Sequence, residues 1–283
     1  MNITGTTRVF VIVGDPVAQV RAPEVYNHLF QRHGVDAVVV PAKVPAASLT
    51  AFVNNALLAE NFGGFWVTIP HKAAMLKLMS RCDAVAKIAG AVNAVRRHAD
   101  GSLEGALFDG LGFAKGLDHF GISVAGRRVL VVGAGGGGQA VAAALAERGA
   151  AHLAISNRTA ARAADLVRLL APTYGPAVAV APSADPAGFD LVVNCTSQGL
   201  KPGDALPFDP ARVDRGAAVV DIIMTREPTP LLKACAALGV TAYPGFEMLV
   251  QQIPEYLRFF GFETMAQTLQ GDLSEVRAVL KPK

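Results

Sequence analysis

Apolar positions along the chain alternate between short runs typical of strands and longer segments with helical spacing. In the first hundred residues, runs rich in β-branched or aromatic residues predict strands, and the amphipathic stretches between them predict helices. The expected strands are 9–13, 38–40, 65–69 and 91–95, and the expected helices are 23–33, 48–60 and 72–79. Ser48 is the expected cap of the second helix. This rhythm indicates an open α/β unit.

The same alternation continues in the second part of the chain. A helix at 110–120 is expected to precede further strands and helices at 129–132, 139–148, 152–156, 159–170, 177–180, 189–194, 218–223, 230–238 and 240–243. The polar, turn-rich stretch 97–102 is the expected linker. We therefore predict the α/β class with two open α/β domains, at 1–103 and 104–244, and tail helices at 245–283 that pack back on the first domain.

A glycine-rich turn follows the buried strand 129–132 and opens a helix, in the pattern Gly-x-Gly-x-x-Gly. The first glycine allows the tight turn, the second lets the backbone approach a pyrophosphate, and the third lets the helix pack close to the strand. A plain turn is the alternative, but the position between strand and helix favours a dinucleotide site in a Rossmann-like domain. The expected cofactor contacts are Gly133, Gly135, Gly136, Gly137 and Gly138.

The residues after strand 152–156 bear on which dinucleotide binds. NAD-binding domains usually place an acidic residue there, which accepts a hydrogen bond from the ribose 2′-hydroxyl. This chain has Asn157, Arg158, Thr159 and Arg162 instead. Two arginines one helical turn apart can bind a 2′-phosphate, so the pattern favours NADP. The alternative is a capped helix start with two solvated arginines.

Composition and charge exclude several classes of protein. Apolar residues make up 52% of the 283 residues, the net charge is +3, and no basic run exceeds two residues. We therefore expect no nucleic-acid partner and no polybasic membrane surface. Three scattered cysteines without a Cys-x-x-Cys pattern indicate reduced thiols and neither a disulfide frame nor a metal site. With no evident signal peptide and no long uninterrupted apolar span, a cytoplasmic protein is expected.

Three polar residues stand where chemistry is conceivable. Lys72 opens a helix at the carboxyl edge of the first sheet, where a helix N-terminus could lower the pKa of its amine, although a surface lysine is the plainer interpretation. Asn93 lies in an apolar strand and needs partners, either the backbone or substrate hydroxyls. Asp109 precedes Gly110 and a helix, so an N-cap is its plainer interpretation.

Taken together, the motifs resemble those of the shikimate/quinate dehydrogenase family along nearly the whole chain. The order and spacing of the motifs are specific, although each alone is not. They are the stretches 14–19, 67–72, 89–93, 108–110, 133–136, 157–162, 194–199, 229–231 and 245–252. The resemblance implies an NADP-dependent enzyme that oxidises a ring hydroxyl of shikimate, quinate or a related cyclic alcohol, or reduces the corresponding ketone, without a metal.

The resemblance also implies roles for individual residues. Lys72 would be the acid–base residue, with Asp109 hydrogen-bonded beside it. Asn93 and Gln252 would bind ring hydroxyls, and Thr68 would line the substrate pocket. The remaining cofactor contacts would be Asn157, Arg158, Thr159 and Arg162 at the 2′-phosphate, and Thr196, Met224, Gly245 and Met248 toward the nicotinamide.

The chain departs from the family pattern at the expected carboxylate clamp. The family usually holds the substrate carboxylate with two hydroxyls of a Ser-x-Ser-Pro motif, and here Val20 and Ala22 occupy those positions. Neither can donate a hydrogen bond. Trp66 stands where the family often has Asn, and Met224 where it often has Tyr. Shikimate is therefore expected to be a poor substrate, with Arg21 as a conceivable but solvent-facing replacement.

Other hypotheses for the function stay open at this point. One is a non-catalytic NADP(H)-binding sensor on the same fold, although such a sensor has no need for Lys72 and Asp109. Others are a different two-domain NADP dehydrogenase, similar to the methylene-tetrahydrofolate enzymes, and a Rossmann-like interaction domain. A small molecule is the expected partner, and the protein is expected to be a monomer or a homodimer.

Overall fold

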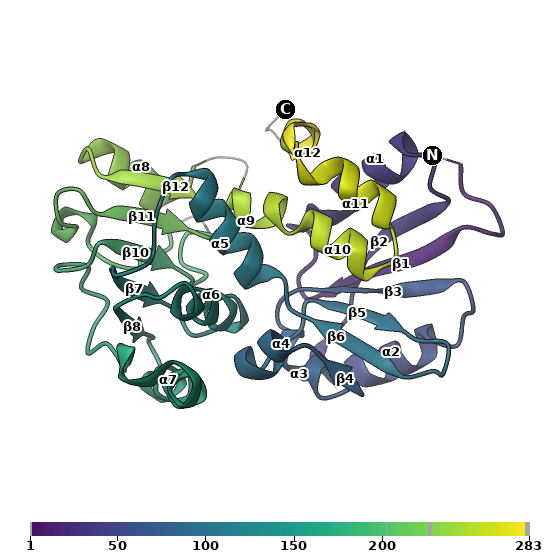
Figure 1. Ribbon diagram of the computed structural model, residues 1–283, viewed down its shortest axis with the longest axis horizontal. Helices are drawn as coiled ribbons and strands as arrows, with labels where there is room; N and C mark the ends of the chain where they lie inside the picture. The colour runs from purple at the N-terminus through teal and green to yellow at the C-terminus, as the bar shows by residue number, and fades with distance from the viewer. Residues whose placement is uncertain (1, 202, 226–227, 281–283) are drawn as a thin grey trace. The chain divides into compact units, whose positions relative to one another are not determined.

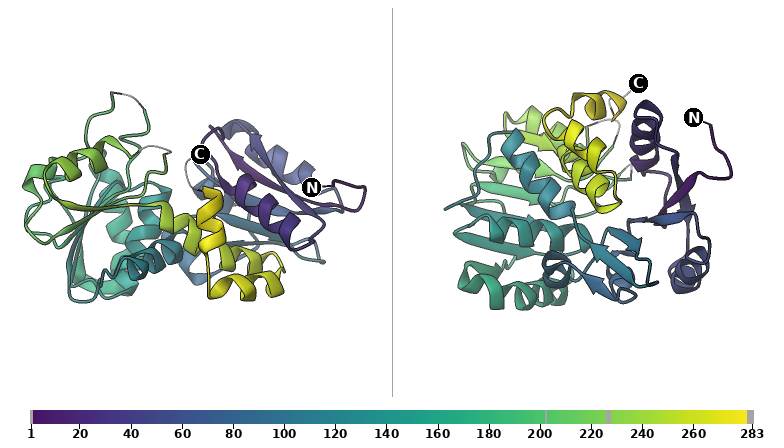
Figure 2. Two further views of the ribbon diagram at one scale, coloured as in Figure 1. Left: turned by 90° about the horizontal axis from the view of Figure 1, so that it is seen from above. Right: turned by 45° about the vertical axis from the view of Figure 1, so that its right-hand side comes forward.

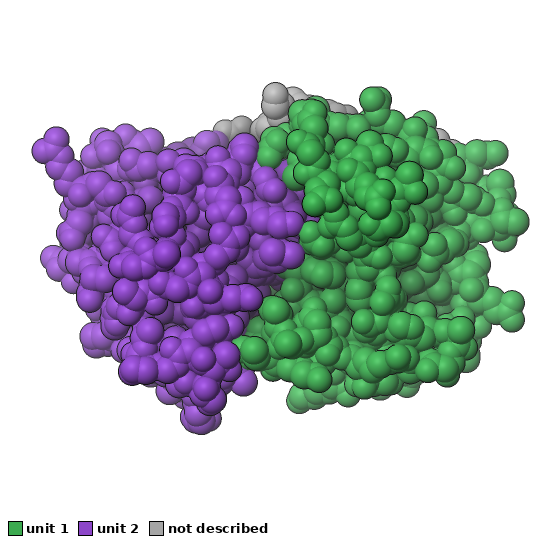
Figure 3. Space-filling view, in the orientation of Figure 1, with its two compact units in different colours: residues 1–108, 253–283 green, residues 109–252 purple. Residues whose placement is uncertain are grey.

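A computed structural model describes residues 2–201, 203–225 and 228–280. The chain divides into two compact units, coloured separately in Figure 3: unit 1 is Met1–Phe108 with Ile253–Lys283, and unit 2 is Asp109–Gln252. Both boundaries lie several residues after the expected ones at 103/104 and 244/245. The physical reasons are a hairpin formed by the last two strands of unit 1 along the chain, and a closely packed pair of helices in unit 2.

Unit 1 is built on a mixed sheet that has six strands among the described residues, in the order β2-β1-β3-β5-β6-β4 (Figure 1). Helices cover both of its faces. Its elements are β1 (Arg8–Gly14), α1 (Ala22–Arg32), β2 (Ala37–Lys43), α2 (Leu49–Ala56), β3 (Phe62–Val67), α3 (Lys72–Leu76), β4 (Arg81–Cys82), α4 (Ala84–Ala89), β5 (Ala94–Arg97), β6 (Leu103–Ala106), α10 (Ile253–Phe259), α11 (Glu263–Gln270) and α12 (Ser274–Leu280).

The expected linker at 97–102 is wrong, because this stretch is a hairpin turn inside the sheet of unit 1. β5 runs antiparallel to both β3 and β6. The His98 N–H donates to the Ser102 carbonyl at 2.9 Å, and Gly101 adopts φ +79° in the turn. Polar turn residues serve a hairpin as well as they serve a linker, so composition alone did not separate the two.

Aromatic side chains form the core on one face of this sheet. The Trp66 ring lies 4.6 Å from the Tyr26 ring and 4.3 Å from the Phe260 ring, measured between centroids. Tyr26 comes from α1 and Phe260 directly follows α10, so this core joins the two ends of the chain. Figure 2 shows the yellow C-terminal helices beside the purple α1. Helices α10 to α12 therefore belong to unit 1.

Unit 2 is built on a parallel sheet that has six strands among the described residues, in the order β12-β11-β10-β7-β8-β9. Successive strands are added on one side of β7 and then, from β10 on, on its other side. This is the doubly wound strand order of a Rossmann domain. Its elements are α5 (Asp109–His119), β7 (Arg128–Val132), α6 (Gly136–Glu147), β8 (His152–Ser156), α7 (Ala160–Tyr174), β9 (Val178–Val180), β10 (Leu191–Asn194), β11 (Ala218–Asp221), α8 (Pro230–Ala237), β12 (Thr241–Pro244) and α9 (Phe246–Gln251).

Helices α5 and α9 pack so closely that α9 belongs to unit 2. A Cβ atom at Gly112 of α5 would lie 2.3 Å from the Met248 carbonyl oxygen of α9. A Cβ at Gly110 would lie 2.5 Å from the Ala140 carbonyl oxygen of α6. Only glycine permits these distances, so the two glycines fix α5 against both neighbours. The unit boundary consequently falls after Gln252.

Several helix ends differ from the expected ones. Helix α2 ends at Ala56, four residues early, and Ser48 makes no capping hydrogen bond with its side chain. Helix α4 was not expected, although Asp83 caps it by accepting from the Ala86 N–H at 2.6 Å. Among the described residues, no helix combines the length and the apolar character that crossing a bilayer requires.

Candidate functional site

The candidate substrate residues of unit 1 lie at one edge of its sheet. The parallel strands β1, β3 and β6 end there, and the antiparallel β5 begins there. Val20 lies in the loop after β1 and Ala22 begins α1, the segment after β3 carries Thr68 and Lys72, and Asn93 directly precedes β5. Five candidates dispersed over seventy residues of sequence are thereby brought to the same edge, where ligands of open α/β sheets bind.

Asn93 is the most deeply held of these residues, with 1% of its surface exposed. Its side-chain oxygen accepts from the Phe108 N–H at 3.0 Å, and its backbone carbonyl accepts from the Val67 N–H at 2.7 Å and from the Tyr256 hydroxyl at 3.1 Å. One of the two alternatives for the Asn93 side chain was a backbone partner, and the Phe108 N–H is such a partner for its amide oxygen. These bonds fix the direction of the side chain.

Lys72 is half-buried and begins α3. Its carbonyl accepts from the Val92 N–H at 3.1 Å, which ties the start of α3 to the residue before Asn93. Thr68 is also half-buried, and its N–H donates to the Val13 carbonyl at 3.0 Å. Lys72 and Asn93 are thus held next to each other through their backbones.

His71 is a positioning residue that sequence reasoning missed. It is 1% exposed, and its Nε2 lies 2.7 Å from the Val44 carbonyl oxygen. This bond anchors the residue immediately before Lys72 to the segment that follows β2. The sequence offers no clear signal for this burial, because the residues beside His71 are exposed or half-buried and the partner lies 27 residues earlier in the chain.

The positions of the expected carboxylate clamp are apolar in space as well as in sequence. Ala22 is buried and Val20 is half-buried. Between them, Arg21 donates from Nε and Nη2 to Glu24 Oε2 at 2.9 and 2.7 Å. The charge of Arg21 is therefore balanced within the first turn of α1. Trp66 is 3% exposed and belongs to the aromatic core, so it does not supply the polar group that an Asn would.

The other two substrate and catalytic candidates lie in unit 2. Asp109 is the first residue of α5 and is 5% exposed, and Gln252 follows α9 and is 4% exposed. A Cβ at Gly112 would lie 3.0 Å from the Gln252 Cβ, so the glycine makes room for the glutamine. Each unit thus contributes its own part of the candidate set, Lys72 in unit 1 and Asp109 in unit 2.

The glycines after β7 have distinct physical roles. Gly133 has φ +111°, and a Cβ there would lie 2.7 Å from the Cys195 carbonyl group. A Cβ at Gly138 would lie 2.0 Å from the Gly133 carbonyl oxygen. At Gly135 a Cβ would meet no atom within 4 Å. The protein's own packing therefore demands the first and third glycines but not the second, which is the one that lets a pyrophosphate approach. Gly136 and Gly137 open α6, whose N-terminus favours an anion.

Asn157 links the two loops at which a dinucleotide would bind. Its side-chain oxygen accepts from the Ala134 N–H at 3.0 Å, and its Nδ2 donates to the Thr159 carbonyl at 2.9 Å. Arg158 and Arg162 are exposed, and neither makes an ion pair within the described part of the chain. A polar clamp with two accessible guanidinium groups and no carboxylate fits a 2′-phosphate.

A buried polar network after β10 and β11 was not foreseen from the sequence. Asp221 accepts from Asn194 Nδ2 at 3.0 Å and from Thr229 Oγ1 at 2.6 Å, while Asn194 Oδ1 accepts from the Thr196 hydroxyl at 2.7 Å. Burial raises the pKa of Asp221. Burial first, and the Asp221 charge second, raise the pKa of the Cys235 thiol to about 11. The network orders the loop that carries Thr196, and Cys235 stays a protonated thiol.

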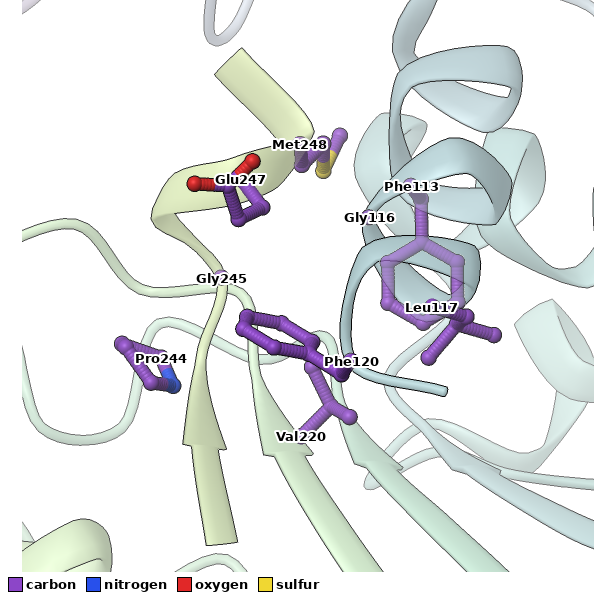
Figure 4. A pocket seen from close by; sticks show the side chains of 9 residues that line it. All are labelled: Phe113, Gly116, Leu117, Phe120, Val220, Pro244, Gly245, Glu247 and Met248. Carbon is purple, nitrogen blue, oxygen red and sulfur yellow. The ribbon is translucent and has the colours of Figure 1, made fainter. Parts of the chain in front are cut away.

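The remaining cofactor candidates lie after β11 and β12, at the same edge of the unit 2 sheet as the glycine turn after β7. They are Gly245, Met248 and Met224. A Cβ at Gly245 would lie 2.3 Å from the Ile222 Cα, so close approach of two backbones requires this glycine. Met248 is 5% exposed and lines a cavity of about 10 Å³ with Phe113 of α5 (Figure 4). A cavity of that size holds about one water molecule, so it is a packing gap and not a ligand pocket. Met224 is half-buried after β11.

Two known protein families match this chain, one within unit 1 and one within unit 2. The family described as the shikimate dehydrogenase substrate binding domain matches residues 12–95, and the shikimate / quinate 5-dehydrogenase family matches residues 116–198. The shikimate dehydrogenase (NADP(+)) of Rubrobacter xylanophilus is 40% identical over 257 residues, which is 89% of this chain and 89% of that protein.

Two solved structures have the same fold over nearly the whole chain. The shikimate dehydrogenase from Aquifex aeolicus is 30% identical, covers 94% of this chain and 98% of its own, and has a TM-score of 0.83. The ligand-free 5-ketofructose reductase of a Gluconobacter strain is 31% identical, with the same two coverages and a TM-score of 0.78. Because these relatives and both family matches agree, the chain belongs to the shikimate/quinate dehydrogenase family of NADP-dependent oxidoreductases.

Proposed function

We propose that this member of the family interconverts a ring alcohol of an uncharged, polyhydroxylated compound with its ketone. The observation that carries the proposal is the pair Val20 and Ala22 at the clamp positions, with Arg21 already paired to Glu24. The 5-ketofructose reductase supports it, because its name denotes an uncharged keto sugar as the substrate of a protein with this fold.

The carboxylate of a shikimate-like acid would meet no hydroxyl donor at positions 20 and 22. A hydrogen bond to a charged group contributes about 1.5–3 kcal/mol, so two missing donors cost about 3–6 kcal/mol of binding. That corresponds to a loss of roughly two to four orders of magnitude in affinity. A substrate without a carboxylate does not suffer this loss, so the apolar pair selects against acids and in favour of neutral alcohols.

The coenzyme fits the residues of unit 2. Gly135 leaves room at the start of α6, and Arg158 and Arg162 are accessible to a 2′-phosphate. When bound, NADP+ supplies the acceptor for the hydride of the carbinol carbon. Asn157 keeps the loop after β7 in place through its two backbone partners, and Thr196, Gly245, Met224 and Met248 belong to the segments expected near the nicotinamide.

In the proposed reaction, Lys72 Nζ takes the hydroxyl proton as the hydride leaves the carbon. In reduction Lys72 returns this proton to the new alkoxide oxygen, so protons and electrons balance. Asp109 orients the lysine amine, and the amides of Asn93 and Gln252 hydrogen-bond to hydroxyls of the substrate. Thr68 lines the pocket beside them. Asn93 is well suited to this role because the Phe108 N–H already fixes its amide.

Steady-state assays of the purified protein test the proposal. NADPH oxidation is followed with 5-ketofructose and with 3-dehydroshikimate, and NADP+ reduction with shikimate, quinate and a neutral cyclic polyol. We expect turnover of neutral substrates and a shikimate kcat/KM at least about a hundredfold below that of the best neutral compound. A shikimate kcat/KM in the ordinary enzyme range, about 10⁴ M⁻¹s⁻¹ or more, would overturn the substrate assignment. Saturable NADP+ binding without turnover of any compound would favour the sensor instead.

A further inference from the structure

Unit 1 contains a cavity at the edge of its sheet opposite to the candidate substrate residues. It has a volume of about 300 Å³ and is lined by the first residue of β1, the start of β3 and the end of β5. β1 has seven residues, and a strand rises about 3.3 Å per residue, so the two edges are roughly 20 Å apart. The cavity is therefore separate from the substrate edge.

Arg8 provides a guanidinium without an acidic partner in this cavity. Its Cζ lies 5.1 Å from the centre of the Phe10 ring and 5.2 Å from that of Phe262. Among the described residues, no carboxylate lies within ion-pair distance of Arg8, and desolvation lowers its pKa. The two rings hold the guanidinium plane in place, which leaves its N–H donors for another acceptor.

Arg97 supplies a second guanidinium from the end of β5. It is half-buried and anchored because its Nη1 donates to the Leu57 carbonyl, and it has no carboxylate partner within the described ranges. Neighbouring side chains are already engaged: His98 Nε2 lies 2.6 Å from Glu104 Oε2, and Asn61 Nδ2 donates to the Thr7 carbonyl at 3.0 Å. The cavity thus combines two positioned arginines with the side chains of Asn61 and His98, which already have partners.

Glu60 is the acidic residue that lines the cavity, and it is exposed. Two arginines against one carboxylate leave an excess of positive charge. A carboxylate repels a bare anion, but it accepts a hydrogen bond from a hydroxyl that stands beside the anionic group. The lining is therefore complementary to an anion that also carries hydroxyls.

We propose that this cavity binds a small hydroxylated phosphate ester, with the phosphate oxygens on Arg8 and Arg97 and a hydroxyl on Glu60. Arginine forks bind phosphate through paired N–H donors, and about 300 Å³ lies at the lower end of small-molecule pockets. The proposal concerns unit 1 alone and is independent of which alcohol the protein oxidises.

Isothermal titration calorimetry of the full chain with glycerol 3-phosphate tests this site, at constant ionic strength. Saturating NADP+ is present, so that the arginines of unit 2 are already occupied. We expect saturable binding that Arg8→Gln and Arg97→Gln each weaken at least about tenfold, since each removes a charge-assisted pair. Inorganic phosphate is the second ligand, and it should bind more weakly because it lacks the ester's hydroxyls.

Arg32→Gln is the matched control, because it changes the net charge of unit 1 equally at an exposed arginine paired with Glu275. It should leave the affinity unchanged. If Arg8→Gln lowers the folding stability, the side-chain Nε–Hε signals of Arg8 and Arg97 in the unaltered protein provide a second readout, and both should shift on addition of glycerol 3-phosphate. Absence of saturable binding, equal weakening by Arg32→Gln, or unmoved arginine signals would each overturn the proposal.

Discussion

The side-chain oxygen of Asn93 accepts a hydrogen bond from the backbone N–H of Phe108 at 3.0 Å. Phe108 ends the first segment of unit 1, and the next residue is Asp109, the candidate catalytic carboxylate. On its other side, Asn93 follows Val92, whose N–H donates to the Lys72 carbonyl. One buried asparagine therefore holds the backbone next to Lys72 and next to Asp109. A role in positioning comes in addition to its proposed contact with substrate hydroxyls.

Replacing the proposed acid–base residue should abolish most of the activity without unfolding the protein. We expect Lys72→Gln to lower kcat by about 10²–10⁴, the usual contribution of a positioned acid–base group. Lys77→Gln is the control, because Lys77 is exposed just after the same helix α3. Rapid mixing under single-turnover conditions measures the chemical step directly. An unchanged rate in Lys72→Gln would remove this lysine from the mechanism.

Restoring the two hydroxyls at the clamp should convert the specificity. In Val20→Ser with Ala22→Ser, each new hydroxyl can donate to a carboxylate, and we expect shikimate kcat/KM to rise by about 10- to 100-fold or more. Ala18→Ser adds a hydroxyl to an exposed position of the same loop and should change nothing. The assay compares shikimate with the best neutral substrate. If the double variant gains nothing, these positions do not face a substrate carboxylate.

The arginines after β8 should determine the choice between the two coenzymes. Removing one charge-assisted contact to a phosphate costs about 1.5–3 kcal/mol, so Arg158→Gln should raise the KM for NADP+ by about 10- to 100-fold. The KM for NAD+, which lacks the 2′-phosphate, should stay nearly constant. Arg168→Gln lies further along α7 and alters an arginine paired with Asp165, which makes it the matched control. Equal losses with both coenzymes would contradict a 2′-phosphate contact.

Trp66 should matter for folding and not for substrate choice. Trp66→Asn introduces the residue often found in the family but removes ring contacts from a buried core, at a cost of about 3–5 kcal/mol. Trp66→Phe keeps an aromatic ring and removes an Nε1–H that has no acceptor among the described residues, so it should cost far less. Urea unfolding measures both. A stable Trp66→Asn protein that oxidises shikimate would place the indole in the substrate site.

Asp221 should make the protein less stable as the pH rises. Burial raises its pKa above the ordinary 3.8, so the folded chain holds a proton that the unfolded chain has released. The free energy of unfolding therefore falls from near pH 3.8 until the raised pKa is passed. In the Asp221→Asn variant, the free energy of unfolding should no longer show this decrease with rising pH. Urea unfolding at a series of pH values from about 2.5 to 7 gives the slope for each protein on both sides of pH 3.8.

The control for Asp221 has the opposite sign. Hydrogen bonding to Arg212 lowers the pKa of Asp185, so its stabilisation is present above pH 3.8 and is lost as the pH falls. Asp185→Asn should therefore remove a component that rises with pH. If both variants changed the slope in the same direction, the assignment to Asp221 would be wrong.

Local patterns predicted most of the fold. The strand–glycine–helix passage at 129–148 and the parallel strands of unit 2 follow from continuous apolar runs bounded by turn residues, which is the pattern of strands buried on both faces. The short strand β6 contains Glu104 and Gly105 and has no such run. Its place in the sheet depends on antiparallel pairing with β5, which is tertiary information. The hairpin was therefore mistaken for a linker, and the boundary was placed too early.

The candidate site likewise contains some residues that the sequence predicted and others that it did not. Its chemistry-bearing residues were found by their motifs, but the groups that hold them were not. His71 acts through the carbonyl of Val44 and Asp221 through Asn194, each 27 residues away, and Asp221 also accepts from Thr229 across a loop. A sequence displays the residue type and its neighbours along the chain. It does not display the partner across a loop, and burial and pKa depend on that partner.

The amide of Asn157 has a consequence for how coenzyme preference can evolve or be engineered. Asn157→Asp would place an acid near the position where NAD-specific domains have one, yet a carboxylate cannot donate to the Thr159 carbonyl that Nδ2 now reaches. The same replacement would thus weaken the loop that it was meant to adapt. A single-step exchange at this position is blocked, and a workable route begins at Arg158 and Arg162, where side chains can change without loosening the backbone beneath them.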